Sequence, residues 1–537
     1  MGQSKSKADA KKNEPIKKIP TEAEQKQKID NLNKLVKNSP YKNLIKSVDI
    51  EAIPPANYET PSKKPRMKLI DNLTCESFVK KIKYNSTKVI DSNSSYSETG
   101  QLIANEKDDD SNQDSNRNKI FVKLFAKLPQ NTTYFVEAMI YNEIIPILLA
   151  KATPFLVPGI KLIQCGPYNE FIALAGEISD KENFSQDDEL NIFKFIEKLK
   201  KQESRLGNPS YSLFMNLSKG LPKTKTLDSV INELLVKKNN EFDNIVLNQN
   251  LKQVTDLIFQ AVWTIFCLSK LDIRHNDTHL NNFLVETLDQ PETFYFNIYD
   301  EIFEMKSKYK IYLFDWDRGT ICSKFKNPDE SFQTLNTMLN ENNLCPEYGC
   351  NRPNQGFDIT VFLIILLRKF GYLIYCCQQP AFSVEYAQSV KACEALYLFV
   401  ERLFSFIFKN KNEPILDIDV GQIFAFGRDF YNNEQISDGI SANFQPKYMY
   451  PEPVRTVVNG ETKTTEMDIK VIWPDLLQAF IDTPPLLTLT ILEPILDKTK
   501  IRKDAVIYSP LANEDLDNYR NILTNLKSDA RYKFLFQ

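Results

Sequence analysis

The chain has 537 residues, a net charge of −3 at pH 7 and 42% hydrophobic residues. This composition can bury a large core in several structural units, and the charge excludes nucleic-acid binding driven by overall charge. Only two histidines occur and the nine cysteines form no C-x-x-C pair, so no zinc site is expected. The odd cysteine count, with no signal peptide, predicts a reducing, intracellular environment.

Residues 1–66 are polar and rich in lysine, and they are predicted to form a disordered basic tail. The first residues, MGQSKS, fit the pattern for N-myristoylation at Gly2, with Ser6 at the downstream position. The lysines that follow would supply the second, electrostatic signal that stable membrane contact requires. An ordinary solvated tail explains the same residues equally well, so both alternatives stay open.

The folded part is expected to begin near residue 67 with a region of short strands. Two strand candidates flank a serine-rich turn within residues 88–105. The segment KIFVKLFAKL, residues 119–128, alternates like a buried strand and carries Lys123. A lysine in a strand usually extends its charge to solvent, so Lys123 becomes informative only through its place in a larger pattern.

A helix is expected over residues 133–150, where apolar residues recur on one side. Its candidates for pairing with a strand lysine are Glu137 and, as the alternate, Glu143, although most helix glutamates are simply solvated. Pro146 is expected to end or kink this helix. Further strands are predicted within 154–175, which includes EFIALAG, and at 211–221, on either side of a charged insertion at 179–209.

Helical periodicity over residues 251–271 predicts a long core helix that leads into LDIRHNDTHLNNFLV, residues 271–285. The spacing of His275, Asp277 and Asn282 is that of a phosphate-transfer catalytic loop. Such a loop needs a carboxylate to orient the attacking hydroxyl and an amide oxygen for a metal ion. The structural alternative is a polar loop between a helix and a strand.

A second polar site follows the loop. After a segment at 286–308 that reads as an insertion, the strand at 311–314 ends in Asp315, with Asp317 two residues later. Carboxylates at the end of a buried strand are the hard oxygen ligands that a Mg²⁺-nucleotide requires. The polar loop at 327–356 would lie where a substrate is received.

Asp358 then opens a very apolar helix, which it is expected to cap. The run Ile359–Leu367 is too short to span a bilayer, so no transmembrane segment is expected. Helices are also predicted at 381–409 and 418–432, whereas the residues after 432 carry no usable motif.

Six polar positions follow the order found in the protein-kinase-like superfamily: Lys123, Glu137, Asp277, Asn282, Asp315 and Asp358. The chain resembles this superfamily over about residues 85–370. The loop reads HNDTH, with His279 where conventional protein kinases have lysine. In this it is similar to choline kinases, aminoglycoside phosphotransferases and divergent kinase-like proteins of giant DNA viruses. The phrase EAMIY resembles the E-x-x-x-Y of the casein-kinase-one and vaccinia-related-kinase group, and Asp-Trp-Asp replaces Asp-Phe-Gly.

The resemblance implies a binding site for ATP and Mg²⁺. Lys123, fixed by Glu137, would pair with the α- and β-phosphates of ATP. Asn282 and Asp315 would hold Mg²⁺, with Asp317 as a further metal ligand.

The resemblance also implies roles for the remaining loop residues. Asp277 would orient the substrate hydroxyl and accept its proton. His279 would lie near the transferring phosphoryl group, where a mostly neutral imidazole is a poorer cation than lysine. His275 would be structural and pack against the Asp315 turn, and Asp358 would brace the loop from below.

The implied fold is α+β and bilobal. A small β-rich N-lobe would occupy residues 67–217 and a larger helical C-lobe residues 218–432, followed by a C-terminal extension at 433–537. The implied location is the cytoplasm, or a host cytoplasm or virion for a viral protein, with peripheral membrane contact through Gly2 and the basic tail.

Three functions stay open. The first is a serine/threonine protein kinase that depends on ATP and Mg²⁺, with a protein as its partner and no nucleic acid. The second is a kinase of a small alcohol, suggested by His279 and by the Asp-Trp-Asp sequence. The third is a catalytically weak pseudokinase scaffold, because residues 88–105 carry only Gly100 where a phosphate-covering loop normally has several glycines.

Overall fold

The computed structural model describes a mixed α+β protein. The described residues are mainly 119–126, 133–181, 211–221, 224–323, 356–378, 384–409, 469–482 and 490–536, with short pieces between them. The chain divides into two compact units, residues 1–50 and 51–537, and every element below belongs to the second. Five predicted features lie wholly or almost wholly outside the described residues: the tail at 1–66 with Gly2, the serine-rich turn at 91–100, the insertion at 179–209, the polar loop at 327–356 and the helix at 418–432.

An antiparallel sheet, the first sheet, carries Lys123. Within the described part of the chain its strand order is β1-β3-β4-β6-β5, with β2 paired to β3. The strands are β1 Ile82–Lys83, β2 Val89–Ile90, β3 Gln101–Glu106, β4 Lys119–Ala126, β5 Gly159–Pro167 and β6 Ser212–Lys219. The strand pair predicted within 88–105 and the strands predicted at 119–128 and 211–221 are therefore confirmed.

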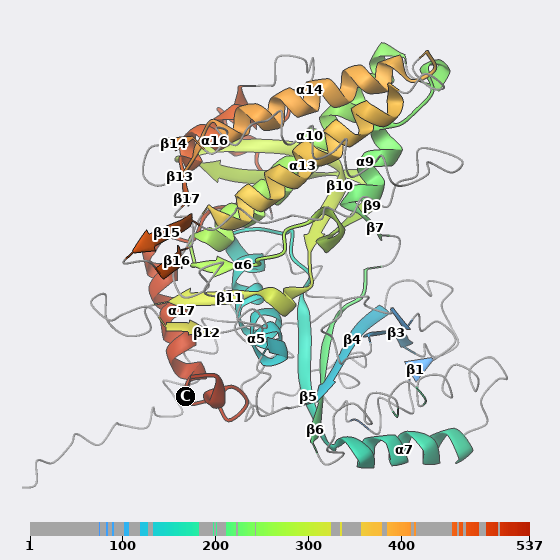
Figure 1. Cartoon of the computed structure of the whole chain (residues 1–537), viewed down its shortest axis with the longest axis vertical. Helices are drawn as coiled ribbons and strands as arrows, with labels where there is room; N and C mark the ends of the chain where they lie inside the picture. Colours follow the sequence, from blue (N-terminus) through green and yellow to red (C-terminus); the bar gives the residue numbers. More distant parts are fainter. Residues whose placement is uncertain are drawn as a thin grey trace, which may run out of the picture. The chain divides into compact units, whose positions relative to one another are not determined.

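The strand predicted for EFIALAG is wrong. These residues lie in helix α7, Tyr168–Lys181, which follows β5 directly (Figure 1). The buried residues Phe171, Ile172 and Ala175 recur at the spacing of a helix face, and this periodicity outweighs the local apolar run.

The helix predicted at 133–150 is present but is not uniform. It consists of α5 Thr133–Met139, the π-helical turn η3 Ile140–Ile144 and α6 Ile145–Lys151. In η3 the N–H of Ile145 donates to the carbonyl of Ile140, five residues back, so one extra residue is accommodated. Pro146 lies in the first turn of α6, where a proline is tolerated. It does not end the helix, which continues to Lys151, but the change from the π-helical turn to α6 occurs next to it.

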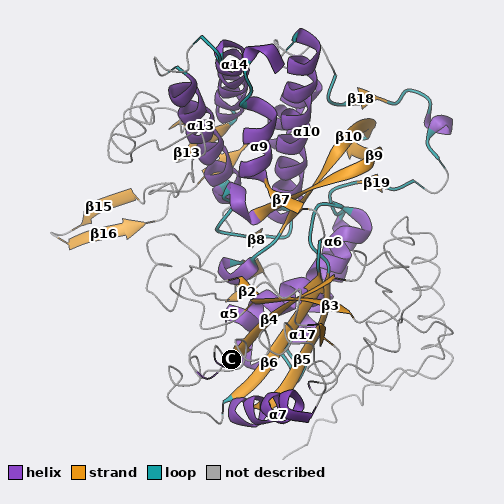
Figure 2. Ribbon diagram, turned by 90° about the vertical axis from the view of Figure 1, so that its right-hand side faces the viewer, coloured by secondary structure: helices purple, strands orange, loops and turns teal. Residues whose placement is uncertain are grey.

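A group of mutually packed helices contains the long core helix predicted at 251–271 (Figure 2). Its members are α9 Leu227–Leu235, α10 Asn244–Ser269, α13 Phe357–Cys377 and α14 Ala387–Phe404. The helix predicted at 381–409 is shorter than expected, because Ile407–Lys409 form strand β13. Asp243 caps α10 by accepting the N–H of Val246.

Two of these helices, α10 and α13, are long and apolar enough to cross a membrane by length and composition, so the expectation that no segment would qualify is wrong. Most of each apolar stretch is buried inside the protein. Core helices of this length meet the same criterion, and for α10 the burial includes Trp263, which packs on Phe259 and Phe296.

The segment that reads as an insertion at 286–308 forms a long hairpin. Its strands are β9 Phe283–Ile298 and β10 Glu301–Leu313, which pair along their length. Short strands extend this second sheet: β7 Thr224–Thr226, β18 Glu493–Pro494 and β19 Ile507–Tyr508. Because β9 starts after Asn282 and β10 ends before Asp315, the pairing of Phe283 with Leu313 brings both parts of the predicted site to one end of the hairpin.

Residues near the C-terminus form α16 Trp473–Ile481, α17 Asn513–Leu526 and the short helix η9 Lys533–Phe536. Phe480 of α16 packs on Phe259 of α10. Strand β17, Ile469–Val471, pairs with β13. Helix α16 and strand β17 therefore pack with elements that precede them in the chain.

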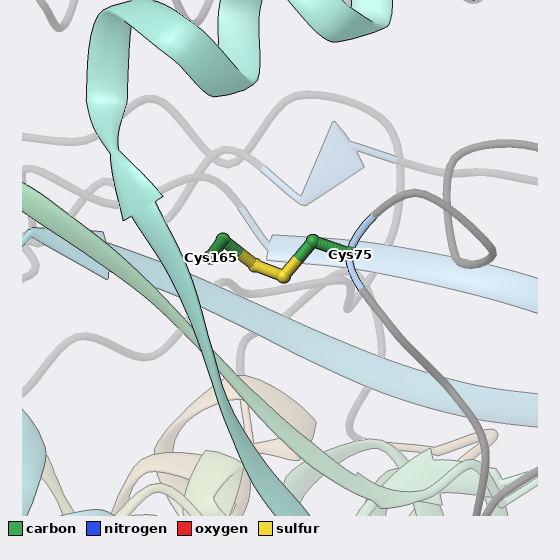
Figure 3. The surroundings of a disulfide bond; sticks show 2 residues. All are labelled: Cys75 and Cys165. Carbon is green, nitrogen blue, oxygen red and sulfur yellow. A yellow bond between two sulfur atoms is a disulfide. The ribbon is translucent and has the colours of Figure 1, made fainter.

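The cysteines depart from the expectation of a wholly reduced set. Cys75 and Cys165, 90 residues apart, form a disulfide between the segment before β1 and strand β5 (Figure 3). Spacing in the sequence could not predict this pair, since the two cysteines meet only when the first sheet forms. The other described cysteines are buried: Cys267, Cys322, Cys376, Cys377 and Cys393.

Candidate active site

Lys123 and Glu137 form a buried ion pair between β4 and α5. The Nζ atom of Lys123 lies 2.8 Å from Oε2 of Glu137. Burial raises the pKa of Glu137 to about 6, although the neighbouring ammonium of Lys123 acts against this rise. Burial alone would lower the pKa of Lys123, but the carboxylates of Glu137 and Asp315 raise it well above its ordinary value. The lysine is therefore held as a cation.

Glu143, the alternate partner for the strand lysine, is excluded. It lies in η3 and its Oε1 is 3.1 Å from the guanidinium of Arg531, near the C-terminus. Six residues separate it from Glu137, so the two carboxylates leave the helix in different directions.

Asp358 braces the loop that contains both histidines, as predicted. Its carboxylate accepts the backbone N–H of His275 at 2.6 Å and that of Asn276 at 2.8 Å, and its carbonyl accepts the Thr278 hydroxyl at 2.8 Å. The expectation that Asp358 caps its own helix is wrong, because Gly356 is the N-cap of α13 and no side chain caps it. The carboxylate is used to hold the loop instead.

Two further contacts fix this loop against the turn that follows β10. Asn276 has a left-handed backbone with φ of +61°, and its amide donates to the carbonyl of Arg318 at 2.7 Å. The Nε2 atom of His275 lies 2.8 Å from the carbonyl oxygen of Phe314, and its ring packs on Trp316 with centroids 4.6 Å apart. The predicted structural role of His275 is confirmed.

Asp277 lies between two nitrogen-bearing side chains. Its carboxylate is 3.4 Å from the guanidinium of Arg318 and 3.6 Å from Nε2 of His279. Nδ1 of His279 accepts the N–H of Asn281, so in the neutral ring Nε2 carries the proton and points it at Asp277. Burial lowers the pKa of His279, which keeps it neutral near pH 7.

Asp315 occupies a strained position at the end of β10. Its backbone is left-handed, with φ of +65°, and its carboxylate is 3.4 Å from Nζ of Lys123. Its N–H donates to the Tyr141 hydroxyl at 3.0 Å, which ties the turn to η3. Asp317 is buried, and burial together with the neighbouring Asp315 raises its pKa well above the ordinary value.

The predicted metal ligands fit Mg²⁺ in their chemistry. The side-chain amide nitrogen of Asn282 donates to the carbonyl of Asp277 at 2.8 Å, which leaves a hard carbonyl oxygen as its remaining group. The partly exposed carboxylate of Asp315 and the buried carboxylate of Asp317 repel each other, and a divalent cation would offset that repulsion. Among the described residues no three His, Cys, Asp or Glu side chains could hold a metal by themselves, so phosphate oxygens and water would have to complete the coordination.

Two functional contacts were not predicted from the sequence. Arg318 beside Asp277 had no motif, although its position directly after the Asp-Trp-Asp turn was a usable signal. Tyr141 was noted only as part of EAMIY, and the π-helical turn that carries it cannot be seen in a periodicity pattern.

Comparison with known proteins identifies no relative, since neither a protein-family model nor a curated protein sequence matches this chain.

Proposed function

We propose that this protein is a phosphotransferase of the protein-kinase-like superfamily that uses ATP and Mg²⁺ and acts on hydroxyl groups, with serine or threonine of a protein as its substrate. The proposal rests mainly on the position of Lys123, whose Nζ atom lies 2.8 Å from Glu137 and 3.4 Å from Asp315. A lysine fixed by a helix glutamate beside a metal-binding aspartate is what pairing with ATP phosphates requires. We further propose a bilobal arrangement, with the first sheet and α5 in the small lobe and α10, α13 and α14 in the large one.

The remaining residues have separate tasks in this proposal. Lys123 pairs with the α- and β-phosphates, and Glu137 keeps its ammonium in place. Asn282, Asp315 and Asp317 would hold Mg²⁺, which would supply positive charge to the phosphate groups when bound. Asp277 orients the attacking hydroxyl and takes its proton, as general bases do.

A small alcohol is the second candidate substrate. The observation in its favour is the loop chemistry: His279 is neutral and directed at Asp277, and Asp317 is buried beside Asp315. His279 and the Asp315-Trp316-Asp317 sequence are the residues in which the chain resembles small-molecule kinases. The scaffold alternative predicts that nucleotide binds without turnover.

The test is transfer of label from γ-labelled ATP in the presence of Mg²⁺, to generic protein substrates and to a panel of small alcohols. The variants are Asp277→Asn, Asp315→Asn and Lys123→Met. The matched controls are Asp256→Asn and Lys369→Met, which remove a buried carboxylate and a buried ammonium outside the site. We expect each site variant to lower kcat/KM by at least 100-fold, because groups that act in the transition state contribute several kcal/mol.

The outcomes separate the alternatives. Transfer that persists in Asp277→Asn would exclude the assigned mechanism. Thermal stabilisation by Mg²⁺-ATP without transfer, abolished in Asp315→Asn, would favour the scaffold. Absence of both binding and transfer in the wild type would refute the proposal.

A further inference from the structure

The helix that carries Glu137 has a second set of partners, at the end of the chain. Arg531 lies 3.1 Å from Glu143 in η3, and the Tyr532 hydroxyl lies 3.5 Å from the same carboxylate. Tyr532 is fully buried. A terminal segment buried in this way is docked on its neighbours and not merely trailing from them.

The contacts extend along the whole helix. At the C-terminal end of the helix, the side chain of Lys151 pairs with Asp515 of α17. The backbone carbonyl of Lys151 accepts the N–H of Ser509 at 3.0 Å. At the other end, Leu535 packs on the aromatic cluster formed by Phe125, Tyr134, Phe135 and Phe214. Residues 509–535 therefore contact α5, η3 and α6 at three points.

The same helix also carries two residues that contact the candidate site. Glu137 holds Lys123, and Tyr141 accepts the N–H of Asp315 at 3.0 Å. Glu143 lies two positions after Tyr141, so displacement of Glu143 would move the group that positions Asp315. Helices with a π-helical turn have a locally changed hydrogen-bond ladder, and such turns often occur at functional sites.

We propose that residues 509–535 act as an intramolecular clamp, in which Glu143, Arg531 and Tyr532 are positioning residues that keep Glu137 on Lys123. This inference rests on the proposed phosphotransferase function. Its consequence is that release of the C-terminal segment lowers nucleotide affinity and turnover without changing any group that touches the substrate.

The test uses charge reversal in the full-length protein. The single variants Glu143→Arg and Arg531→Glu should each increase hydrogen exchange of residues 133–151 by about tenfold and weaken Mg²⁺-ATP binding by about tenfold. The double variant, Glu143→Arg with Arg531→Glu, should restore most of the wild-type protection from hydrogen exchange and most of the Mg²⁺-ATP affinity. Arg531→Gln is a milder second variant for the case in which a reversal fails to fold. Arg520→Glu, on the exposed side of α17 and paired only locally with Asp517, is the matched control and should match the wild type.

A further cycle separates positioning from general stabilisation. In a Glu137→Gln background, Arg531→Glu should weaken Mg²⁺-ATP binding by less than twofold more, because the path through Glu137 is already interrupted. Single reversals with wild-type exchange and binding, or an undiminished effect in the Glu137→Gln background, would overturn the clamp. A wild type that binds no Mg²⁺-ATP, while exchange still responds to the reversals and is restored in the double variant, would refute the phosphotransferase and support the clamp.

Discussion

The negative charge of Asp277 is balanced by the residues around it. Burial keeps His279 neutral, and that histidine contributes a directed N–H instead of a permanent cation. The permanent cation beside Asp277 is Arg318, at 3.4 Å, since a guanidinium stays protonated at all physiological pH values. We therefore infer that Arg318 supplies the positive charge beside Asp277, whereas His279 supplies only an N–H group.

Asp256 of α10 allows a pH test at the scale of one residue. Burial raises its pKa from 3.8 to about 7, against the effect of Lys252, which lies 2.9 Å away. Between pH 4 and pH 7 the folded state then binds more protons than the unfolded state, so this group lowers stability as pH rises. The shift corresponds to at most about 4 kcal/mol.

Asp256→Asn should remove the loss of stability that ionisation of Asp256 causes as the pH rises. We expect the variant to gain stability relative to the wild type between pH 4 and pH 8, as measured by urea denaturation at each pH. A stability difference that stays constant over this range would show that Asp256 titrates normally.

At the scale of elements, the helix from Thr133 to Lys151 is the central connection. It contacts the first sheet through Glu137 and through Asn142, whose amide donates to Asn216 at 3.1 Å. Strand β5 passes so close to η3 that only glycine fits at residue 159. A Cβ atom there would lie 2.4 Å from the carbonyl oxygen of Tyr141.

Gly159→Ala should therefore destabilise the protein by about 1–3 kcal/mol, because backbone atoms must move to relieve the clash. Gly176→Ala is the matched control. It lies inside α7, where an added Cβ meets nothing within 4 Å, and it should stabilise the protein by about 0.5–1 kcal/mol. Thermal or urea unfolding measures both, and equal effects would contradict the close approach of β5 to η3.

At the scale of the whole molecule, the Cys75–Cys165 disulfide closes a loop that contains β1 to β4 and the helix from α5 to α6. Lys123 and Glu137 both lie inside this loop. The crosslink therefore lowers the conformational entropy, in the unfolded state, of the segment that forms one side of the candidate site.

Removing the crosslink should lower the free energy of unfolding by about 2–5 kcal/mol, as expected for a loop of this length. Cys165→Ser and reduction of the wild type should give similar losses in urea denaturation, and a reductant should not affect Cys165→Ser further. Detection of both cysteines as reactive thiols in the native, non-reduced protein would contradict the disulfide.

Much of the local structure could be predicted because it depends on short-range patterns. The alternation of KIFVKLFAKL gave β4, and the apolar spacing of α10 gave the core helix. Predictions failed where distant contacts outweigh local preference. Asp358 had the sequence position of a helix cap, but its carboxylate is used by two N–H groups more than eighty residues away.

The sequence by itself determined which chemical groups are available and in what order: a strand lysine, two candidate helix glutamates, a loop with Asp277 and Asn282, and a turn with Asp315 and Asp317. This was possible because the spacing of residues along the chain indicates which of them belong to the same strand, helix or loop. Only the tertiary structure decided the choice of Glu137 over Glu143, the pairing of Arg318 with Asp277 and the docking of Arg531 and Tyr532. These depend on packing between elements far apart in the chain, which no local pattern encodes.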